Sequence, residues 1–344
     1  KKKTGNDIRD IYMKDPLLNL ASRAALRTVD RTQAFPSIQH GLRNGGVEKI
    51  VHEHNALLSY VKKCALAPNN DSSTHGCITE DEHYAQLTSE IVSISLDFSK
   101  AFSNLNRACA LQKAFDCEAL SAIHRVLAFE VGAPAHSFAI KRGVIAFHAL
   151  SSNGTAAGSV FGTTLFAIGV QNIYEQIDQF VKTRSTALYK DLQCLTTACI
   201  DDLTITAHVT VIQDLLAHLS NASEGGLKPQ LLEMGLTFNA TKTQLISPVP
   251  TDSRTQSLKD HLETIGREIT VLDRTSFPRL CGALVGTYSQ NEVNEFWENN
   301  VLPDTRTLIR HLKHKDMPHR LGFAILRLCV PSRASFFART TPSH

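Results

Sequence analysis

The sequence predicts an α+β fold, and three observations support this prediction. Short β-rich runs alternate with helical patterns in a mixed order, unlike an all-α bundle or a barrel. Hydrophobic residues make up 42% of the 344 residues and charged residues 20%, as in ordinary globular proteins. No apolar run reaches the roughly 18 residues that a membrane-spanning helix needs, so no association with a membrane is expected.

The first half of the chain is predicted to contain two helical regions on either side of a buried strand. Residues 41–66 combine a glycine-rich turn with an amphipathic helical pattern, whose apolar positions are Ile50, Leu57, Leu58 and Val61. Residues 67–83 are polar and rich in turn formers, which predicts a surface loop. An apolar strand then ends at Asp97, and residues 103–130 are helical by pattern.

The second half is predicted to alternate helices with short strands. A long helix over 158–181 follows a glycine-rich start, and its inner side is formed by Leu165, Ile168, Ile173 and Ile177. Residues 194–208 are two β-rich runs around an acidic turn, which is the pattern of a hairpin, and a helix follows over 209–220. Residues 278–287 indicate a buried strand with glycine turns, and the pattern from Glu292 onward is helical and basic.

The net charge of +3 hides a strong asymmetry along the chain. Residues 1–50 carry ten Lys and Arg against five Asp and Glu, and residues 301–344 carry eight against two. Residues 51–300 carry eighteen against twenty-six. Two basic ends around an acidic centre suit a protein that grips a polyanion while it holds divalent cations. A solvated surface with uneven charge is the alternative.

The cysteines and the N-terminus narrow the class of protein. The eight cysteines include no CxxC pair, which argues against a zinc site or a small disulfide framework and favours reduced intracellular thiols. The basic start "KKKTGNDIRDIYMKDP" has no apolar segment behind it, so it is not a signal peptide. Because the chain lacks an initiator methionine, we expect it to be a fragment of a longer protein.

Three aspartates are the candidate catalytic groups. Asp97 ends a buried strand, and Asp201 and Asp202 lie at the tip of the predicted hairpin. Adjacent aspartates are common in simple turns, but here apolar, strand-like residues flank each acid. Three clustered carboxylates repel one another unless cations neutralise them. Magnesium prefers oxygen ligands, and two such ions about 3.5–4 Å apart can promote nucleotidyl transfer.

Four segments carry a family resemblance: "LDFSKAF", "GTAAGSVFGTTLF", "CIDDL" and "GLTFNATKT". Their order and spacing are similar to the palm motifs of reverse transcriptases, and the chain most resembles those of non-LTR (LINE-type) retrotransposons. Three more segments extend the likeness over residues 35–342. "GLRNGGVEKIVHEHNALL" looks like part of the fingers, "LCGALVGT" like a segment after the palm, and "AILRLCVPSRASFFARTTP" like the start of the thumb.

The resemblance implies a right-hand polymerase fold with a ferredoxin-like palm, fingers and the beginning of a helical thumb. It assigns residues 1–92 to an N-terminal extension and the fingers, 93–290 to the palm with interleaved fingers segments, and 291–344 to the start of the thumb. The palm motifs then fall at 95–102, 154–166, 199–203 and 235–242. The implied activity is that of an RNA-directed DNA polymerase, a nucleotidyltransferase within a retrotransposon polyprotein.

The same resemblance assigns roles around two magnesium ions, for which manganese can substitute. Asp97 and Asp201 would bind both ions, with Asp202 as the neighbouring acid and the backbone carbonyl of Phe98 as a further ligand. Phe102 matches an aromatic steric gate that selects dNTPs by excluding a 2′-hydroxyl. The alternative for Phe102 is a residue of the core.

Two further residues are matched to the nucleotide. Lys242 matches a lysine near the triphosphate, where it can neutralise or protonate the leaving group. The alternative is an exposed loop lysine. Gly158 matches a glycine that lets the following helix approach template and nucleotide closely.

Departures from the family pattern fall at substrate contacts. Ala157 lacks an amide expected to contact nucleotide or template, Val160 and Thr163 replace prolines that stiffen the turn, and Cys199 replaces an aromatic that contacts the primer end. An active but divergent enzyme fits this pattern and is favoured. A decayed copy that serves as an RNA-binding scaffold also fits. An RNA-dependent RNA polymerase is a third interpretation, against which Phe102 argues.

The basic C-terminal helices are predicted to bind nucleic acid. Helix-like turns carry four cations that could follow the phosphate backbone of an RNA–DNA hybrid, namely Arg306, Arg310, Lys313 and Arg320. The implied partners are an RNA template, a DNA primer or target, and dNTPs, while the oligomeric state stays open. The family implies an intracellular protein, nuclear where it acts and cytoplasmic while bound to element RNA.

Overall fold

The computed structural model describes residues 16–35, 37–66, 80–141, 144–155, 159–223, 225–247, 269–272, 277–286, 288–314 and 317–341. The helices are α1 (Pro16–Leu26), α2 (Arg31–Ala34), α3 (Gly46–Leu66), α4 (Glu80–Ser89), α5 (Ala101–Asn104), α6 (Arg107–Asp116), η1 (Glu118–Ile123), α7 (His124–Val131), α8 (Val160–Leu188), α9 (Val209–Ser220), α10 (Lys228–Glu233), α12 (Gln290–Phe296), η3 (Trp297–Val301), α13 (Leu302–Leu312) and α14 (His319–Thr340). The strands are β1 (Ile91–Leu96), β2 (Ala135–Lys141), β3 (Val144–Ser151), β4 (Leu195–Cys199), β5 (Asp202–His208), β6 (Gln244–Ile246), β7 (Thr270–Leu272), β8 (Arg279–Leu280) and β9 (Ala283–Leu284).

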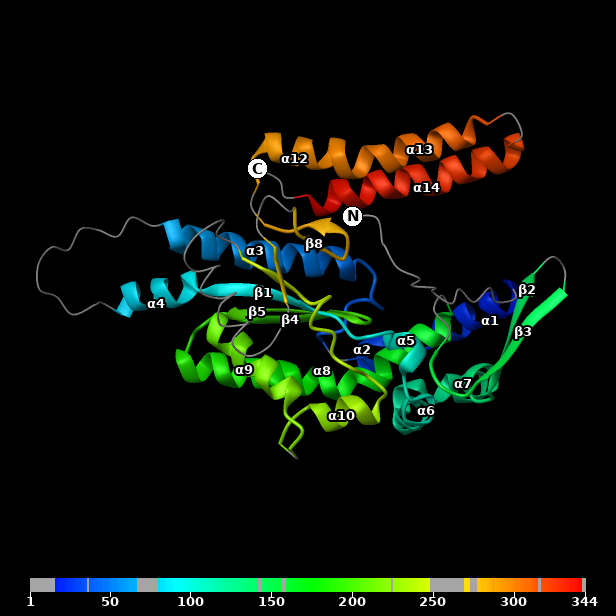
Figure 1. The fold of residues 1–344 in the computed structure, drawn as a ribbon, viewed down its shortest axis with the longest axis horizontal. Helices are drawn as coiled ribbons and strands as arrows, with labels where there is room; N and C mark the ends of the chain where they lie inside the picture. Colours follow the sequence, from blue (N-terminus) through cyan, green and yellow to red (C-terminus); the bar gives the residue numbers. More distant parts are fainter. Residues whose placement is uncertain are drawn as a thin grey trace, which may run out of the picture.

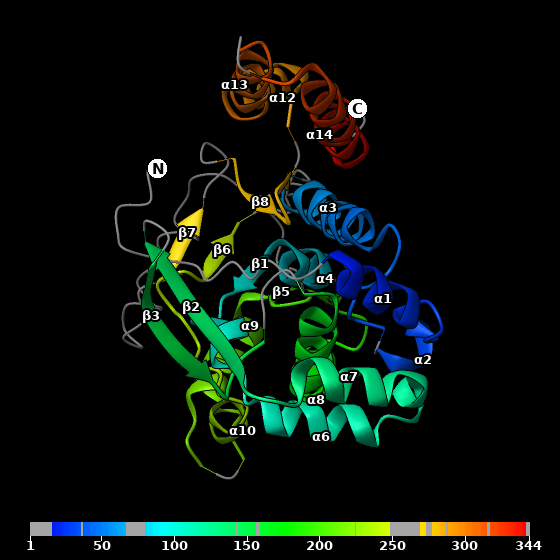
Figure 2. The ribbon, with the colours of Figure 1, turned by 90° about the vertical axis from the view of Figure 1, so that its right-hand side faces the viewer.

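These elements form layers around one mixed sheet, which confirms the predicted α+β class (Figure 1). Helices α8 and α9 cover one face of the sheet, and α3 covers the other. Helices α12 to α14 form a further layer beyond α3 and the β8–β9 hairpin (Figures 1 and 2).

Strand β1 lies at the centre of the main sheet. In the part of the chain that the structure describes, the strand order is β4-β5-β1-β6-β7. β1 pairs antiparallel with β5 and β6, whereas β6 and β7 are parallel. The hairpin predicted over 194–208 is confirmed, since β4 pairs with β5 from Leu195↔Thr206 to Cys199↔Asp202. The end of β1 therefore lies beside the acidic turn of the hairpin.

Alternation along β1 and β5 gives the sheet two different faces. The face toward α8 and α9 is apolar and belongs to the main core, with Val92, Ile94, Leu96, Leu203, Ile205 and Ala207 all buried. The face toward α3 is rich in hydroxyls, among them Ser93, Thr197, Thr204 and Thr206. His54 of α3 is buried there, and its ring nitrogens lie 2.6 Å from Thr206 Oγ1 and 2.7 Å from Thr197 Oγ1.

Helices α3, α8 and α9 agree with the patterns that predicted them. α9 spans the predicted range, and the inner residues predicted for α8 are buried. On α3, Ile50, Leu58 and Val61 are buried and Leu57 is half-buried. α8 extends seven residues past the predicted end at residue 181, to Leu188.

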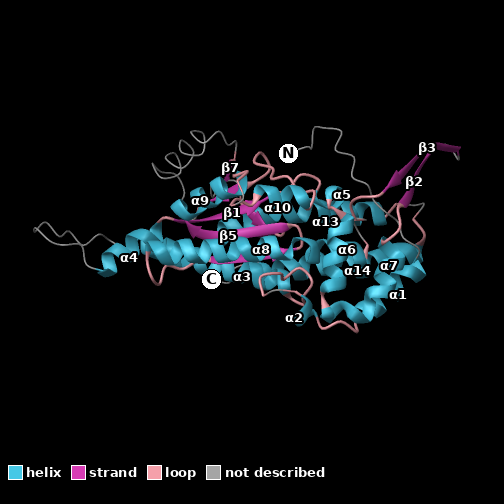
Figure 3. Ribbon diagram, turned by 90° about the horizontal axis from the view of Figure 1, so that it is seen from below, coloured by secondary structure: helices cyan, strands magenta, loops and turns pink. Residues whose placement is uncertain are grey.

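Local structure differs from the predictions at four places. The helical pattern over 103–130 is divided among α5, α6, η1 and α7. Asn106 separates α5 from α6, because it caps α6 by accepting a hydrogen bond from Cys109 N at 3.3 Å. α4 begins at Glu80, inside the predicted loop over 67–83, of which residues 67–79 lie outside the described residues. The segment 278–287 forms two short paired strands rather than one. The hairpin β2–β3 was not predicted, and it extends away from the other elements (Figures 1 and 3).

Among the described residues, no helix is both long enough and apolar enough to cross a lipid bilayer.

Candidate active site

The sheet brings Asp97 and the Asp201–Asp202 pair to the same end. β1 ends at Leu96, which pairs with Leu203 of β5. The antiparallel register, continued by one residue, puts Asp97 opposite Asp202. Asp97 and Asp201 are half-buried and Asp202 is exposed, so the acidic group lies where the sheet meets solvent.

The three acids influence one another electrostatically. Burial is the largest cause that raises the pKa of Asp202 to about 6, and the charges of Asp201 and Asp97 raise it further. The charges of Asp201 and Asp97 act on Asp202 although its side chain is exposed to solvent. Their repulsion means that a cation at this end of the sheet would relieve unfavourable charge.

The backbone of Asp97 is held from the β6 side of the sheet. Asp97 O accepts a hydrogen bond from Asn239 N at 2.9 Å, and Ser99 N donates to Thr237 O at 2.9 Å. Phe98, between them, forms an isolated antiparallel bridge with Phe238. Since alternate residues of a strand direct their carbonyls to opposite sides, the carbonyl of Phe98 faces the β5 side, where the aspartate pair lies.

The turn that carries the aspartate pair is conformationally strained. Ile200 has φ 63°, a left-handed conformation that β-branched residues seldom adopt. Beneath it, the buried Tyr174 of α8 donates a hydrogen bond from its hydroxyl to Asp201 O at 3.3 Å. Burial raises the pKa of Tyr174, and the charges of Asp201 and Asp202 add to this effect, so the phenol remains a donor.

Phe102 is the second residue of α5, and Lys100, with φ 47°, is the N-cap of this helix. The ring of Phe102 is half-buried and stacks on the ring of the buried Phe166 of α8, with centroids 4.8 Å apart. This stacking fixes the plane of the ring while one part of it stays accessible.

Gly158 and Ala157 lie outside the described residues, but the segment on either side of them is firmly held. Arg107 is buried, and its guanidinium donates to the carbonyls of Gly154 at 2.7 Å, Asn153 at 2.9 Å and Ala133 at 3.1 Å. Ser159 starts α8 by accepting a hydrogen bond from Gly162 N at 3.2 Å, and it donates to Glu130 Oε1 at 2.9 Å.

Lys242 is exposed and lies on a turn that is attached to Asp97. Asn239 Oδ1 accepts a hydrogen bond from Lys242 N at 3.4 Å, while Asn239 N is the group that binds Asp97 O. Thr243 closes the turn, since its Oγ1 accepts from Asp97 N at 3.2 Å and donates to Asn239 O at 2.9 Å. Lys242 is thereby placed on the same end of the sheet as the acids.

The four predicted nucleic-acid-binding cations are not brought to the acids. They are exposed on and beside α13 and α14, in the layer beyond α3: Arg306, Arg310, Lys313 and Arg320 (Figure 1). Arg306 Nη2 lies 3.2 Å from Glu298 Oε2, and both side chains are well exposed, so this ion pair adds little stability.

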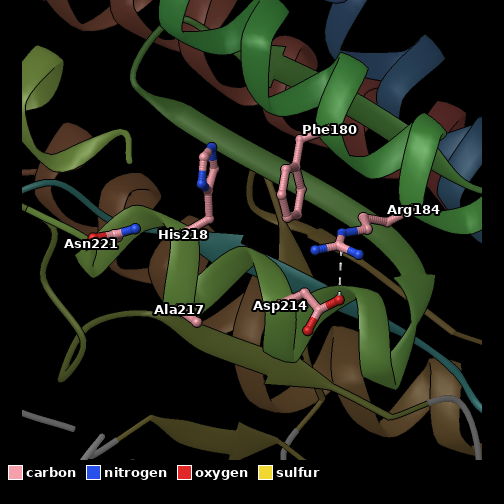
Figure 4. A pocket seen from close by; sticks show the side chains of 6 residues that line it. All are labelled: Phe180, Arg184, Asp214, Ala217, His218 and Asn221. Carbon is pink, nitrogen blue, oxygen red and sulfur yellow. Dashed lines mark ion pairs between the residues drawn. The ribbon is translucent and has the colours of Figure 1, made fainter. Parts of the chain in front are cut away.

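A pocket of about 370 Å³ lies behind the sheet, between α8 and α9 (Figure 4). There the rings of Phe180 and His218 stack with centroids 4.5 Å apart, and Arg184 Nε lies 3.6 Å from Asp214 Oδ2. None of the predicted site residues lines this pocket. The acidic end of the sheet, and not the pocket, is therefore the candidate active site.

The donor groups at the acidic end fit magnesium. Within the described ranges, no three His, Cys, Asp or Glu side chains form a ready-made metal group. Magnesium, however, is usually held by one or two carboxylates together with waters and substrate phosphates. Asp97 and Asp201 can supply carboxylates of this kind, and Asp202 lies beside them at the same end of the sheet.

Comparison with protein families agrees with this geometry. The family model for reverse transcriptase (RNA-dependent DNA polymerase) matches residues 1–272. The chain belongs to the reverse transcriptase family. A mixed sheet with acids at one end and helices on both faces agrees with the right-hand polymerase fold predicted for this reverse transcriptase.

Solved structures similar to this reverse transcriptase domain include two telomerases. Apo telomerase from Candida tropicalis has 12% identity and a TM-score of 0.38, over 66% of this chain and 35% of that chain. Telomerase from Candida albicans, in complex with a TWJ fragment of telomeric RNA, has 13% identity and a TM-score of 0.39, over 69% and 34%. The chain thus spans about a third of the length of each. No curated protein matches the chain.

Sequence reasoning missed the residues that support the acids from a distance. Tyr174 and Thr243 each contact an aspartate backbone, across 27 and 146 residues of sequence. A buried tyrosine usually needs a hydrogen-bond partner, and this was the one available signal for Tyr174, which lies one turn before Ile177 on the inner side of α8. No comparable signal pointed to Thr243.

Proposed function

We propose that this domain is an RNA-directed DNA polymerase of the non-LTR retrotransposon type, with Asp97, Asp201 and Asp202 at its catalytic centre. The observation that supports it best is the juxtaposition of Asp97 with the aspartate pair across the β1–β5 register. The motifs "LDFSKAF" and "GTAAGSVFGTTLF" support the non-LTR assignment. In this proposal the main sheet belongs to the palm, and α12 to α14 begin the thumb.

Asp97 and Asp201 would hold two magnesium ions, with Asp202 and the Phe98 carbonyl beside them. The bound ions would activate the primer 3′-hydroxyl and stabilise the leaving pyrophosphate. The protein's own contribution is to keep the ligands in place before the nucleotide arrives. Hydrogen bonds to the backbones of Asp97 and Asp201 serve this purpose, because they fix both acids independently of the metal.

Phe102 and Lys242 would act on the nucleotide. The Phe102 ring, fixed against Phe166, would occupy the space that a ribose 2′-hydroxyl needs and so select dNTPs. Lys242 would neutralise negative charge on the triphosphate or give a proton to the leaving group. RNA template and DNA primer would meet the basic helices α13 and α14.

Primer extension on an RNA template with Mg²⁺ and dNTPs tests this function. We expect extension by the wild-type protein and none by Asp201→Asn, because the substituted amide cannot serve as an anionic ligand. The matched control is Asp214→Asn, which neutralises an exposed aspartate on α9, behind the sheet, and is expected to extend normally. Equal extension by Asp201→Asn and wild type would refute the assignment of the acids.

The alternative is an RNA-binding scaffold without catalysis, which the altered segment around Ala157 and Val160 favours. Wild-type protein that binds an RNA–DNA hybrid but extends no primer, with either Mg²⁺ or Mn²⁺, would support the scaffold. A preference for NTPs over dNTPs would instead indicate an RNA polymerase.

A further inference from the structure

The side chain of Gln39 binds the backbone of Ile200, the residue that precedes Asp201. Gln39 is 2% exposed, and its Oε1 accepts hydrogen bonds from Ile200 N at 2.9 Å and from Gly41 N at 3.1 Å. Its Nε2 lies 3.4 Å from Ile200 O, as a longer donor contact. One buried amide therefore satisfies both backbone groups of the residue with φ 63°.

The segment around Gln39 is itself attached to the hairpin. Ala198 N donates to Ile38 O at 2.7 Å, and His40 N donates to Ala198 O at 2.8 Å, so the segment runs beside β4 as a parallel bridge. Two residues on, Gly41 lies against the turn. A Cβ at Gly41 would come within 2.7 Å of Ile200 Cγ1 and 2.8 Å of Ile200 N, so a larger residue would displace the turn.

The acid-bearing turn is thus held from two sides. Gln39 binds Ile200 from the edge of the sheet, and Tyr174 binds Asp201 O from below, through α8. A left-handed isoleucine persists only where its surroundings hold it in that conformation. Without the Gln39 contacts, Ile200 can relax, and the backbone of Asp201 moves with it.

We propose that Gln39 is a positioning residue, which fixes the turn bearing Asp201 and so sets the affinity of the acidic group for divalent cations. This inference rests on the proposed function, since it takes Asp201 to be a metal ligand. Gln39 is not proposed as a ligand itself, because its amide is bound to the backbones of Ile200 and Gly41. It acts through the backbone of Ile200.

The test measures Mn²⁺ binding to the whole chain without nucleic acid, by electron paramagnetic resonance of free Mn²⁺. Gln39→Met keeps the shape of the side chain and removes its hydrogen bonds. We expect about a tenfold higher Mn²⁺ dissociation constant, as is typical when the support behind a metal ligand is removed. Gln39→Glu keeps the acceptor for Ile200 N and Gly41 N and loses the longer donor contact to Ile200 O, so we expect it to bind Mn²⁺ more tightly than Gln39→Met.

Two further variants separate positioning from general stability. Asn55→Leu removes another buried amide, which accepts from Gly286 N at 2.8 Å, so it should lower the melting temperature without changing Mn²⁺ affinity. Gly41→Ala displaces the turn while Gln39 stays intact, so it should weaken Mn²⁺ binding even if Gln39→Met fails to fold.

The outcomes distinguish this inference from the proposed function. Unchanged Mn²⁺ affinity in folded Gln39→Met or Gly41→Ala overturns the positioning role, even where wild type extends primers. Weakened binding in these variants, rescued by Gln39→Glu, supports it even if wild type proves to be a scaffold without polymerase activity. If Asp201→Asn binds Mn²⁺ as wild type does, both proposals fail together.

Discussion

Asp202 shows how the acidic end responds to pH without metal. Its pKa is raised to about 6, so the folded protein holds this proton more tightly than the unfolded chain, where the pKa is 3.8. The stability that the shift provides is present at low pH and disappears as pH rises from about 4 to about 6. At neutral pH the fold therefore contains an unfavourable charge that a cation would compensate.

Asp202→Asn should consequently raise the melting temperature at pH 7.5 in the absence of divalent ions. The gain in melting temperature should shrink at pH 4.5, where Asp202 is protonated in wild type. Mg²⁺ should also reduce the gain, because it stabilises wild type, with its three acids, more than the variant. Thermal denaturation followed by circular dichroism checks this. A variant less stable than wild type at pH 7.5 would show that Asp202 makes favourable contacts instead.

Phe102 offers a second prediction at the scale of single residues. Phe102→Ala should increase the incorporation of NTPs relative to dNTPs in primer extension, because the ring that excludes the 2′-hydroxyl is gone. It should also cost some stability, since the stacking with Phe166 is worth about 0.5–1.5 kcal/mol beyond the area it buries. Phe115→Ala, which shortens another partly exposed phenylalanine, serves as the control. An unchanged ratio would leave Phe102 as a packing residue.

At the scale of elements, the packing of α3 on the polar face of the sheet depends on a neutral histidine. Burial, and secondarily the charge of His40, lowers the pKa of His54 to about 3. Its two ring nitrogens can then serve one donor and one acceptor role between the hydroxyls of Thr206 and Thr197. Protonation of His54 would place a charge in a buried site. The packing of α3 on this face of the sheet therefore requires a neutral His54 and weakens at acidic pH.

This arrangement predicts acid sensitivity. Below pH 6.5 His54 binds a proton in the unfolded chain but stays neutral in the native protein. The free energy of unfolding therefore falls as pH drops from 6.5 toward 3, by roughly 5 kcal/mol in all. His54→Leu should be less stable than wild type at pH 7.5, by about 1–3 kcal/mol, because two hydroxyls are left without their imidazole partner. Its stability should depend less on pH between 6.5 and 4.5. Urea denaturation at several pH values tests this, with the exposed His52→Leu as control.

The sequence predicted those elements whose pattern is local. The β4–β5 hairpin and α9 follow from runs of apolar residues and one acidic turn. The meeting of Asp97 with that turn was expected from the resemblance to reverse transcriptases, because no local pattern shows that β1 pairs with β5. Gln39 and Tyr174 could not be predicted, because each acts on a backbone far away in sequence. The β2–β3 hairpin was missed because no strand pattern was recognised between α7 and α8.

For the whole molecule, the separation of charges is the main electrostatic feature. The acids lie at one end of the sheet. The cations lie on and beside α13 and α14, and these helices form the layer beyond α3 (Figure 2). A nucleic acid that reaches both sites would be bound through its phosphate backbone at α13 and α14, while the proposed reaction would take place at the acidic end of the sheet. Backbone binding of this kind is sensitive to salt and tolerant of sequence.

The double variant Arg306→Gln/Arg310→Gln should therefore weaken binding to an RNA–DNA hybrid irrespective of its sequence. The slope of log K against log salt should become shallower by about 0.7–0.9 for each phosphate that the variant no longer neutralises. Fluorescence anisotropy over a series of KCl concentrations measures this slope. Lys182→Gln/Lys190→Gln removes two exposed cations at the end of α8, on the other side of the sheet, and should leave the slope unchanged. Identical slopes for both double variants would contradict a role for α13.

The hydrogen bonds of Arg107 have a practical consequence for engineering. The Arg107 guanidinium donates hydrogen bonds to Ala133 O, just before the β2–β3 hairpin, and to the carbonyls of Asn153 and Gly154, just after it. These hydrogen bonds hold together the two chain segments at the base of the β2–β3 hairpin. We therefore expect that the two strands of this hairpin, β2 and β3, can be replaced by a shorter loop or a reporter while the path of the chain into α8 is preserved.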